Sequence, residues 1–329
     1  MNTEFFAGVN TEKGFKGYLE DYFSDAKRVY IIKGTPGSGK STLMKRLARD
    51  CEKQGYDVWR ILCSSDPESL DGIYLKDKKT AIADGTAPHV LEPKHPLAKE
   101  ILFDTGRFID MKKVDTEGIF KASTQKIARY RKGYGYIKSG VAAERTAILG
   151  AETDKDGMEN YLERFFKKHI LSGAAGETGF RVAAAFTGKG LRTCNPFPNA
   201  KRVFCLKGLG GECFLNSLVD KGVLLGEKMT LCPHPTRYGE YNGVFFHGKG
   251  VYVTSIQADG EDLHTSRFVT GKEGVKEGLN LAKKAYSLAE KELLKAADAH
   301  KELEGYYSAA MDFGALEKEY HGLLQGLTE

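Results

Sequence analysis

The chain has 329 residues, of which 41% are hydrophobic and 28% are charged, and its formal net charge at pH 7 is +5. This composition is typical of a soluble globular protein with room for two domains. No apolar run approaches the length of a membrane span, and the mild positive charge gives no argument for a nucleic-acid or membrane partner.

Two features bear on the cellular compartment. Residues 1–6 lack the basic and then apolar order of a signal peptide. The six cysteines form no C-x-x-C pair with metal-site spacing, so we expect them to be reduced. The sequence therefore predicts a cytoplasmic protein.

The first clear strand signal, residues 29–32, leads into a glycine-rich loop. Residues 34–42 fit the P-loop pattern G-x-x-x-x-G-K-[ST], and a helical pattern follows over residues 43–48. A strand before and a helix after are the context in which this motif binds phosphate. The predicted nucleotide-binding residues are Gly34, Thr35, Pro36, Gly37, Ser38, Gly39, Lys40, Ser41 and Thr42.

The chemistry of this loop follows from its residue types. Glycines let successive N–H groups turn toward a phosphate, and the following helix adds its N-terminal donors and dipole. Lys40 is predicted to reach the β- and γ-phosphates, and the Ser41 hydroxyl to complete a Mg²⁺ shell. ATP and Mg²⁺ are therefore the predicted ligands.

Two carboxylates follow later strand signals. Residues 58–62 form a strand candidate after the helix, and alternating strands and helices favour a parallel sheet whose ligands gather at the carboxyl ends of its strands. Asp84 ends the apolar run 80–83, as a Walker B aspartate does, and is predicted to hold or orient the metal. Asp66 is placed to accept a proton from an attacking hydroxyl or water. Both have a simpler alternative, because Asp84-Gly85 and Asp66-Pro67 are also good turn sequences.

A proline-rich loop, residues 87–96, follows Asp84. It contains His89, Glu92 and His95, which invite a metal hypothesis. The prolines favour an extended loop with ordinary surface histidines instead. The loop is also placed to close over the nucleotide or to bind a second substrate.

From residue 112 to 171 the sequence becomes helical and basic. Residues 126–136 interleave cations with aromatic side chains. Such a stretch suits a surface for RNA or for single-stranded nucleic acid, a lid whose Arg129 or Arg131 meets the γ-phosphate, or a solvated helix face. A helical apolar stripe follows at Met158, Leu162, Phe165, Phe166 and Ile170.

The chain repeats itself. Residues 26–34 reappear as 200–208 with conservative apolar changes, and three further blocks recur in the same order. These pairs are 7–15 with 183–191, 62–67 with 231–235, and 71–75 with 242–246. The sequence therefore predicts a duplicated α/β unit with a boundary near residues 172–176, giving domains at 1–172 and 173–329.

The second copy is predicted to have lost its phosphate site. Counting on from Gly208 places Cys213 at the third glycine, Phe214 at the lysine and Leu215 at the serine. The counterpart of Asp84 is Ser255, and that of Asp66 falls at or beside His234. We therefore expect one competent site.

Helical spacing returns near the C-terminus at Leu281, Ala285, Leu288 and Ala289, and then at Leu316, Tyr320, Leu323, Leu324 and Leu327. The expected fold is α/β, with two tandem P-loop NTPase-like units and mainly parallel sheets. Each unit is expected to carry its own helical hairpin, and the second unit is degenerate.

Three segments together resemble a known family: residues 33–42, 63–72 and 84–89. The chain is similar to a little-characterised bacterial family of tandem P-loop proteins, described as ATPases or nucleotide-kinase-like ATP-binding proteins. The resemblance implies ATP binding but not the reaction. The second loop departs from the P-loop signature at Cys213, Phe214 and Leu215.

Three functions remain open from the sequence. In an ATPase, Lys40 and Mg²⁺ neutralise phosphate charge, Asp84 positions the metal and water attacks. In a kinase, Asp66 activates a small-molecule or nucleotide acceptor. A non-catalytic nucleotide-sensing or assembly module, with the degenerate copy as a regulatory or dimer-like partner, is the third hypothesis. An oligomer is compatible with each.

Overall fold

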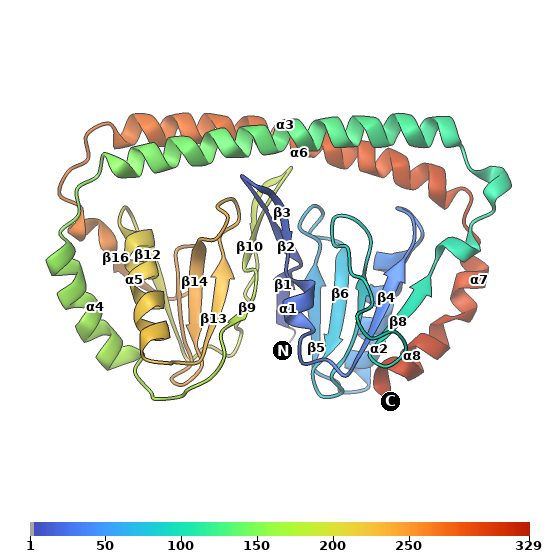
Figure 1. Ribbon diagram of the computed structural model, residues 1–329, viewed down its shortest axis with the longest axis horizontal. Helices are drawn as coiled ribbons and strands as arrows, with labels where there is room; N and C mark the ends of the chain where they lie inside the picture. The colour runs from blue at the N-terminus through green and yellow to red at the C-terminus, as the bar shows by residue number, and fades with distance from the viewer. Residues whose placement is uncertain (1–2) are drawn as a thin grey trace.

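The computed structural model describes residues 3–329 and consists of two α/β units beneath a pair of long helices (Figure 1). Residues 1–2, the start of the segment considered for a signal peptide, lie outside the described residues. Among residues 3–329, no helix has the length and apolar character needed to cross a membrane.

The first unit is built on a six-stranded sheet with the order β1-β5-β6-β7-β4-β8. All its strands are parallel except β6, which pairs antiparallel with β5 and β7. The strands are β1 (Thr3–Phe6), β4 (Arg28–Lys33), β5 (Val58–Leu62), β6 (Leu70–Leu75), β7 (Thr80–Asp84) and β8 (Glu100–Asp104). A hairpin, β2 (Gly8–Thr11) and β3 (Gly14–Gly17), projects toward the long helices, and α1 (Leu19–Tyr22), α2 (Lys40–Lys53), η1 (Gly106–Phe108) and η2 (Met111–Lys113) complete the unit.

The second unit repeats this plan. Its sheet order, β16-β12-β15-β14-β13-β9, matches that of the first strand for strand, again with one antiparallel strand, β14. Its elements are β9 (Gly179–Phe180), β10 (Ala184–Thr187), β11 (Gly190–Thr193), β12 (Arg202–Lys207), α5 (Gly211–Leu224), β13 (Met229–Pro233), β14 (Tyr241–Phe246), β15 (Val251–Thr254), β16 (Glu261–His264) and η3 (Thr265–Phe268). The predicted pair of α/β units is confirmed; the boundary near residue 172 stays a prediction.

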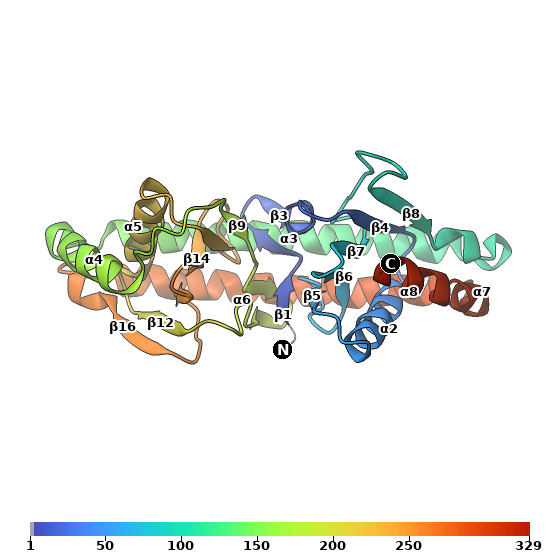
Figure 2. The same ribbon diagram turned by 90° about the horizontal axis from the view of Figure 1, so that it is seen from below.

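Two helices of 34 residues, α3 (Thr116–Leu149) and α6 (Val275–Ser308), run side by side across both units (Figure 2). Small residues let them approach closely: a Cβ atom on Gly133 would lie 3.0 Å from Leu293, and one on Gly140 would lie 2.8 Å from Tyr286. The predicted α6 is present, but its buried face is made of alanines such as Ala282, Ala285 and Ala289. Leu281 and Leu288, which we expected on that face, are exposed instead. The leucines buried on it are Leu293, which packs against Gly133, and Leu303.

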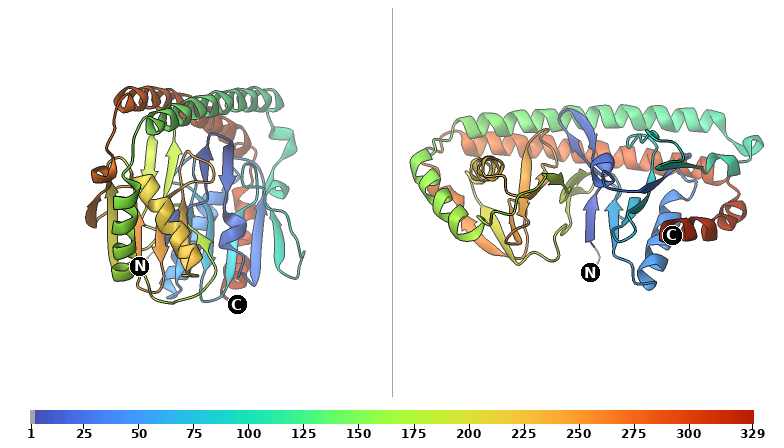
Figure 3. Two further views of the ribbon diagram at one scale, coloured as in Figure 1. Left: turned by 60° about the vertical axis from the view of Figure 1, so that its left-hand side comes forward. Right: turned by 60° about the horizontal axis from the view of Figure 1, so that its bottom comes forward.

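The remaining helices are exchanged between the units, which differs from the expected separate hairpins. After α3, helix α4 (Lys155–His169) packs on the second sheet; after α6, helices α7 (Phe313–Lys318) and α8 (Tyr320–Thr328) pack on the first (Figure 3). The physical reason is length, because a 34-residue helix spans about 50 Å and carries the chain past its own unit. The stripe Met158, Leu162, Phe165, Phe166 and Ile170 is buried in the second unit, and Leu316, Tyr320, Leu323 and Leu327 in the first.

The exchange makes a testable prediction about stability. Leu327 is fully buried in the first unit's core, so Leu327→Ala should lower the free energy of unfolding of that unit by about 2–5 kcal/mol. Trp59, the single tryptophan, lies in β5 and reports this unfolding by fluorescence in a denaturant titration. The control Leu281→Ala, at a 61% exposed site of α6, should change little. Wild-type stability in Leu327→Ala would contradict the exchange.

Candidate nucleotide-binding site

The glycine-rich loop joins β4 to α2 at the sheet edge that faces the long helices. Gly39 caps α2 with φ of +83°, and Gly37 has φ of +72°; both are left-handed conformations that favour glycine. A Cβ atom on Gly37 would lie 2.3 Å from the carbonyl oxygen of Glu304 in α6. The loop is therefore shaped by glycine and touched from above by a helix that comes from the second unit.

Lys40 is the central charge of the loop. It is 8% exposed, and its Nζ donates to the carbonyl oxygens of Thr35 (2.7 Å) and Gly34 (3.3 Å). The Oδ2 atom of Asp84 lies 3.6 Å from Nζ. The structure thus brings together the predicted lysine, at the start of α2, and the predicted Walker B-like aspartate, at the end of β7, the parallel neighbour of β4.

The Asp84 carboxylate has two kinds of contact. Its Oδ1 accepts hydrogen bonds from the backbone N–H (2.9 Å) and hydroxyl (2.6 Å) of Thr86, which is the turn chemistry considered above. Its Oδ2 faces Lys40. Turn formation and a role beside the phosphate site are therefore compatible in one side chain.

The residues of the loop fit a phosphate with a hard cation. Thr35 Oγ1 is buried without a hydrogen-bond partner, which is an unfavourable state that a phosphate oxygen would relieve. Ser41 Oγ accepts a hydrogen bond from Leu70 N (3.0 Å) and keeps a further lone pair for a ligand. Ser41 and Asp84 supply oxygen ligands of the kind that Mg²⁺ prefers.

Asp66 lies in the turn between β5 and β6. Its Oδ2 accepts from the Ser69 hydroxyl (2.8 Å) and its Oδ1 from Glu68 N (3.4 Å), so both oxygens support the turn. It also faces α6: burial, and next the Asp66 charge, raise the pKa of Glu304. Its role as a catalytic base stays a prediction.

The long helices form a polar roof over this region. Lys126 Nζ of α3 lies 3.4 Å from His300 Nδ1 of α6, and the Tyr130 hydroxyl of α3 lies 3.1 Å from Ser65 Oγ. Burial, and then the charges of Lys126 and Lys40, lower the pKa of His300 to about 4, so the ring is neutral near pH 7. A lid was one of the hypotheses for this basic stretch, and α3 does lie over the site.

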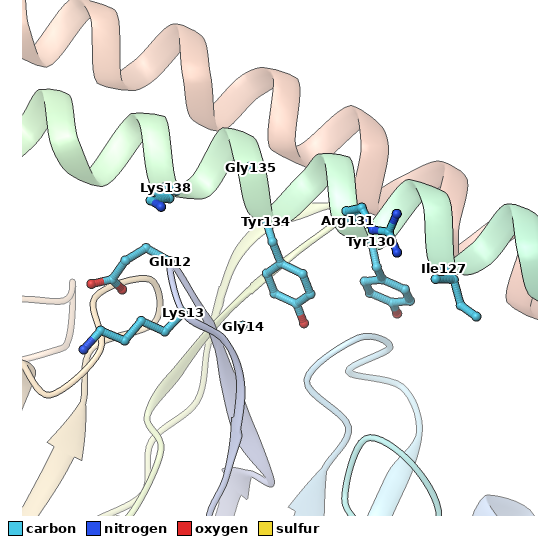
Figure 4. A pocket seen from close by; sticks show the side chains of 9 residues that line it. All are labelled: Glu12, Lys13, Gly14, Ile127, Tyr130, Arg131, Tyr134, Gly135 and Lys138. Carbon is cyan, nitrogen blue, oxygen red and sulfur yellow. The ribbon is translucent and has the colours of Figure 1, made fainter.

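The cations assigned to that lid are placed differently. Arg129 pairs with Glu292 of α6 at 3.0 Å instead of facing the loop. Arg131 lines an open cavity of about 530 Å³ between α3 and the β2–β3 hairpin, where Tyr130 and Tyr134 point down from α3 (Figure 4). Lys126 is the α3 cation that faces the site, because one helical turn separates it from Tyr130 and both point the same way.

The proline-rich loop also differs from expectation in part. His95 is exposed and Glu92 pairs with Lys33, so the suggested cluster of the two histidines with Glu92 does not form. His89, expected at the surface, is only 8% exposed, packs edge-on against Phe15 and lies 2.7 Å from Asp71. Burial acts to lower the pKa of His89, but the Asp71 carboxylate outweighs it and the pKa is raised.

Several residues at this edge carried no prediction. Thr105, directly after β8, is fully buried and links the loop to the strand: its Oγ1 lies 2.9 Å from Ser38 Oγ and donates to Lys33 O at 3.1 Å. Asp84 was predicted because ligands gather at the carboxyl ends of parallel strands, and the same reasoning applied to β8 would have pointed to Thr105. No sequence motif marks Lys126, His300 or Glu304, because only the tertiary fold brings these residues to the site.

The corresponding loop of the second unit is shorter than predicted. Gly210 caps α5 with φ of +86°, as Gly39 caps α2. Gly39 comes five positions after Gly34, whereas Gly210 comes two positions after Gly208, the counterpart of Gly34. The loop of the second unit is therefore three residues shorter. The register counted from Gly208 is therefore wrong.

In the corrected register, Gly211 takes the place of the lysine and Glu212 that of the serine. Cys213 aligns with Thr42, while Phe214 and Leu215 are core residues in the places of two apolar residues of α2. The loss of the phosphate-binding residues holds in either register.

An ion pair fills the position of the lost site. The turn bond from His234 N to Glu240 O matches that from Cys63 N to Ser69 O, which aligns Arg237, and not His234, with Asp66. The side chain of Arg237 is 4% exposed and donates to both carboxylate oxygens of Glu212, one of them at 2.6 Å. Ser255 does take the place of Asp84.

Comparison with known proteins identifies the general class. A family model described as Novel STAND NTPase 3 matches residues 21–84, the segment that runs from α1 through the P-loop to Asp84. No curated protein and no solved structure matched the chain. The match supports a P-loop NTPase domain in the first unit, and such a domain implies nucleotide binding.

Proposed function

We propose that this protein is a Mg²⁺-dependent, cytoplasmic ATPase with a single competent site in its first unit, and that its nucleotide state is passed to the second unit through α6. One observation carries the second part: the Glu304 carbonyl of α6 touches Gly37 at the tip of the P-loop. The other end of α6 follows directly from the second unit. The resemblance to tandem bacterial P-loop proteins supports ATP as the nucleotide.

The residues divide the chemistry as follows. Lys40 would exchange its contacts with the Thr35 and Gly34 carbonyls for phosphate oxygens, and Ser41 and Asp84 would hold the cation. When bound, Mg²⁺ supplies charge neutralisation on the β- and γ-phosphates. Lys126 and His300 lie over the same edge and would restrict water there.

The contact between Gly37 and Glu304 would couple nucleotide binding to the position of α6, one of the two long helices above the site. The end of α6 lies against the tip of the loop at Gly37, so a movement of the loop when nucleotide enters would displace α6. Because α6 packs along the whole of α3, and α3 leads into α4 on the second sheet, a shift at one end is transmitted as a rigid-body movement.

A nucleotide or small-molecule kinase is a second candidate, favoured by the position of Asp66 beneath α6. Release of phosphate from ATP, measured with and without nucleosides, nucleotides and sugars, separates the hypotheses. Phosphate release without an acceptor supports the ATPase, whereas ADP formation that depends on an acceptor supports the kinase. Tight binding with neither would favour a nucleotide-sensing or assembly module.

The number of sites gives an independent prediction. Equilibrium titration of the wild-type chain should give one ATP per chain, because Glu212 and Arg237 neutralise each other where the second phosphate would lie. Two equivalents of ATP per chain would contradict the single-site proposal.

A further inference from the structure

Three residues capable of binding metal meet beside the P-loop. Cys63 follows β5, Asp71 belongs to β6, and His89 lies in the loop after β7. They meet because β6 is antiparallel, so it begins at the edge where β5 and β7 end. One candidate ligand atom from each residue lies within 4.8 Å of the others.

The contact between two of these groups is not an ordinary hydrogen bond. His89 Nε2 lies 2.7 Å from Asp71 Oδ2, which is an ion-pair contact. The ring N–H is not directed along this line, however, so Asp71 Oδ2 is buried without a well-directed hydrogen bond. Asp71 is 7% exposed and His89 is 8% exposed. A buried carboxylate oxygen without a well-directed hydrogen bond is unfavourable. An ion bound by both groups would replace this contact once the two atoms move apart, because ligands of one tetrahedral ion lie farther apart than 2.7 Å.

We propose that Cys63, Asp71 and His89 form a binding site for a divalent transition metal of the zinc class. Thiolate sulfur, imidazole nitrogen and carboxylate oxygen are together the ligand set of Zn²⁺, whereas Mg²⁺ and Ca²⁺ take oxygen ligands. Three protein ligands leave the fourth position of a tetrahedral ion to water or substrate. The Cys63 thiol loses its proton when it binds the ion as a thiolate.

The site is separate from the phosphate loop but connected to it. Leu70, next to Asp71, donates its N–H to Ser41 Oγ at 3.0 Å. An ion held by Cys63 and Asp71 would therefore fix the strand start that contacts the predicted Mg²⁺ ligand.

The second unit provides a comparison within the same chain. The matching turn bonds align His234 with Cys63, and the sheet register aligns Asn242 with Asp71. The segment between β15 and β16, residues 255–260, has no room for a counterpart of the His89 loop. The ligand set is thus present only in the unit that keeps Lys40.

Titration of the purified full chain with Co²⁺, after removal of metal by a chelator, tests the proposal without nucleotide. We expect one equivalent to bind, with thiolate-to-cobalt charge-transfer absorption that Zn²⁺ abolishes by competition. Cys63→Ser should remove the charge-transfer band. His89→Gln and Asp71→Asn should each weaken Co²⁺ binding by at least about 100-fold. Loss of a residue that only orients a metal ligand lowers the affinity by about 10- to 100-fold, so a larger effect indicates a direct ligand.

Two controls separate this site from others. Cys213→Ser removes an exposed thiol in α5 and should leave the spectrum unchanged. Lys40→Ala should also keep Co²⁺ binding, so that failure of the ATPase proposal is distinguishable from failure of this one. Absence of the thiolate band in the wild-type protein would overturn the proposal whether or not the variants fold, and so would its persistence in folded Cys63→Ser.

Discussion

Lys40→Ala should abolish ATP turnover, or reduce it by at least about 100-fold, while leaving the fold intact. We expect this size of effect because removing one hydrogen-bond donor that stabilises charge in a transition state lowers kcat by about 100-fold or more. The fold should survive because Asp84, which faces Lys40 across 3.6 Å, keeps two hydrogen bonds from Thr86. The variant therefore removes the phosphate-binding charge without leaving a carboxylate wholly unpaired.

Nucleotide affinity and phosphate release are the measurements, and a circular-dichroism melt checks the fold. Lys45→Ala is the matched control, since it removes an exposed lysine from the same helix. Unchanged affinity and turnover in Lys40→Ala would refute the site. Equal losses in both variants would show that the effect comes from α2 itself and not from the loop.

The local parts of the site could be predicted from sequence. A P-loop needs a strand, a glycine-rich turn and a helix within one short segment, so Gly39 and Lys40 are recognisable without tertiary contacts. The paired blocks likewise predicted two similar sheets, because strand order is inherited with the repeat. Asp84 was found because it ends an apolar strand.

The roof and the exchange of helices could not be predicted in this way. Helical periodicity shows which face of α4 or α8 is apolar, but not which sheet covers it. That choice depends on the length and direction of α3 and α6, which place Glu304 over Gly37 although 267 positions separate them. His89 was misjudged for a related reason: its partner Asp71 lies on another strand.

The alignment of the second loop with the first was wrong because it was made by counting residues from Gly208. Alignment from Gly208 assumed equal loop lengths, whereas the helix caps show that the second loop is three residues shorter. A local signal did exist, since Phe214-Leu215 repeats the buried apolar pair Leu43-Met44 of α2. Aligning the helix instead of the loop would have placed Glu212 at the serine position.

Glu212→Ala should destabilise the second unit by about 2 kcal/mol, between the cost of breaking an exposed and a buried ion pair, because the Glu212 side chain is 36% exposed whereas that of Arg237 is buried. Arg237 is 4% exposed at its side chain, and without Glu212 its guanidinium would keep one carboxylate, Glu240, at 3.2 Å. That remaining contact also limits the expected loss. Hydrogen exchange in α5 and in the turn 234–240 measures the loss locally.

The double variant Glu212→Ala/Arg237→Met decides how the second unit should be understood. If the pair only fills an abandoned phosphate site, removing both charges should restore much of the stability lost in Glu212→Ala, because no buried charge is left unpaired. ATP turnover in the first unit should remain near wild type, since Lys40 and Asp84 are untouched. A double variant that is stable but has lost turnover would instead show that the ion pair, beneath Glu144 and Tyr286 of the two long helices, transmits the movement of α6. The second unit would then act on catalysis through the charges that replaced its own phosphate site.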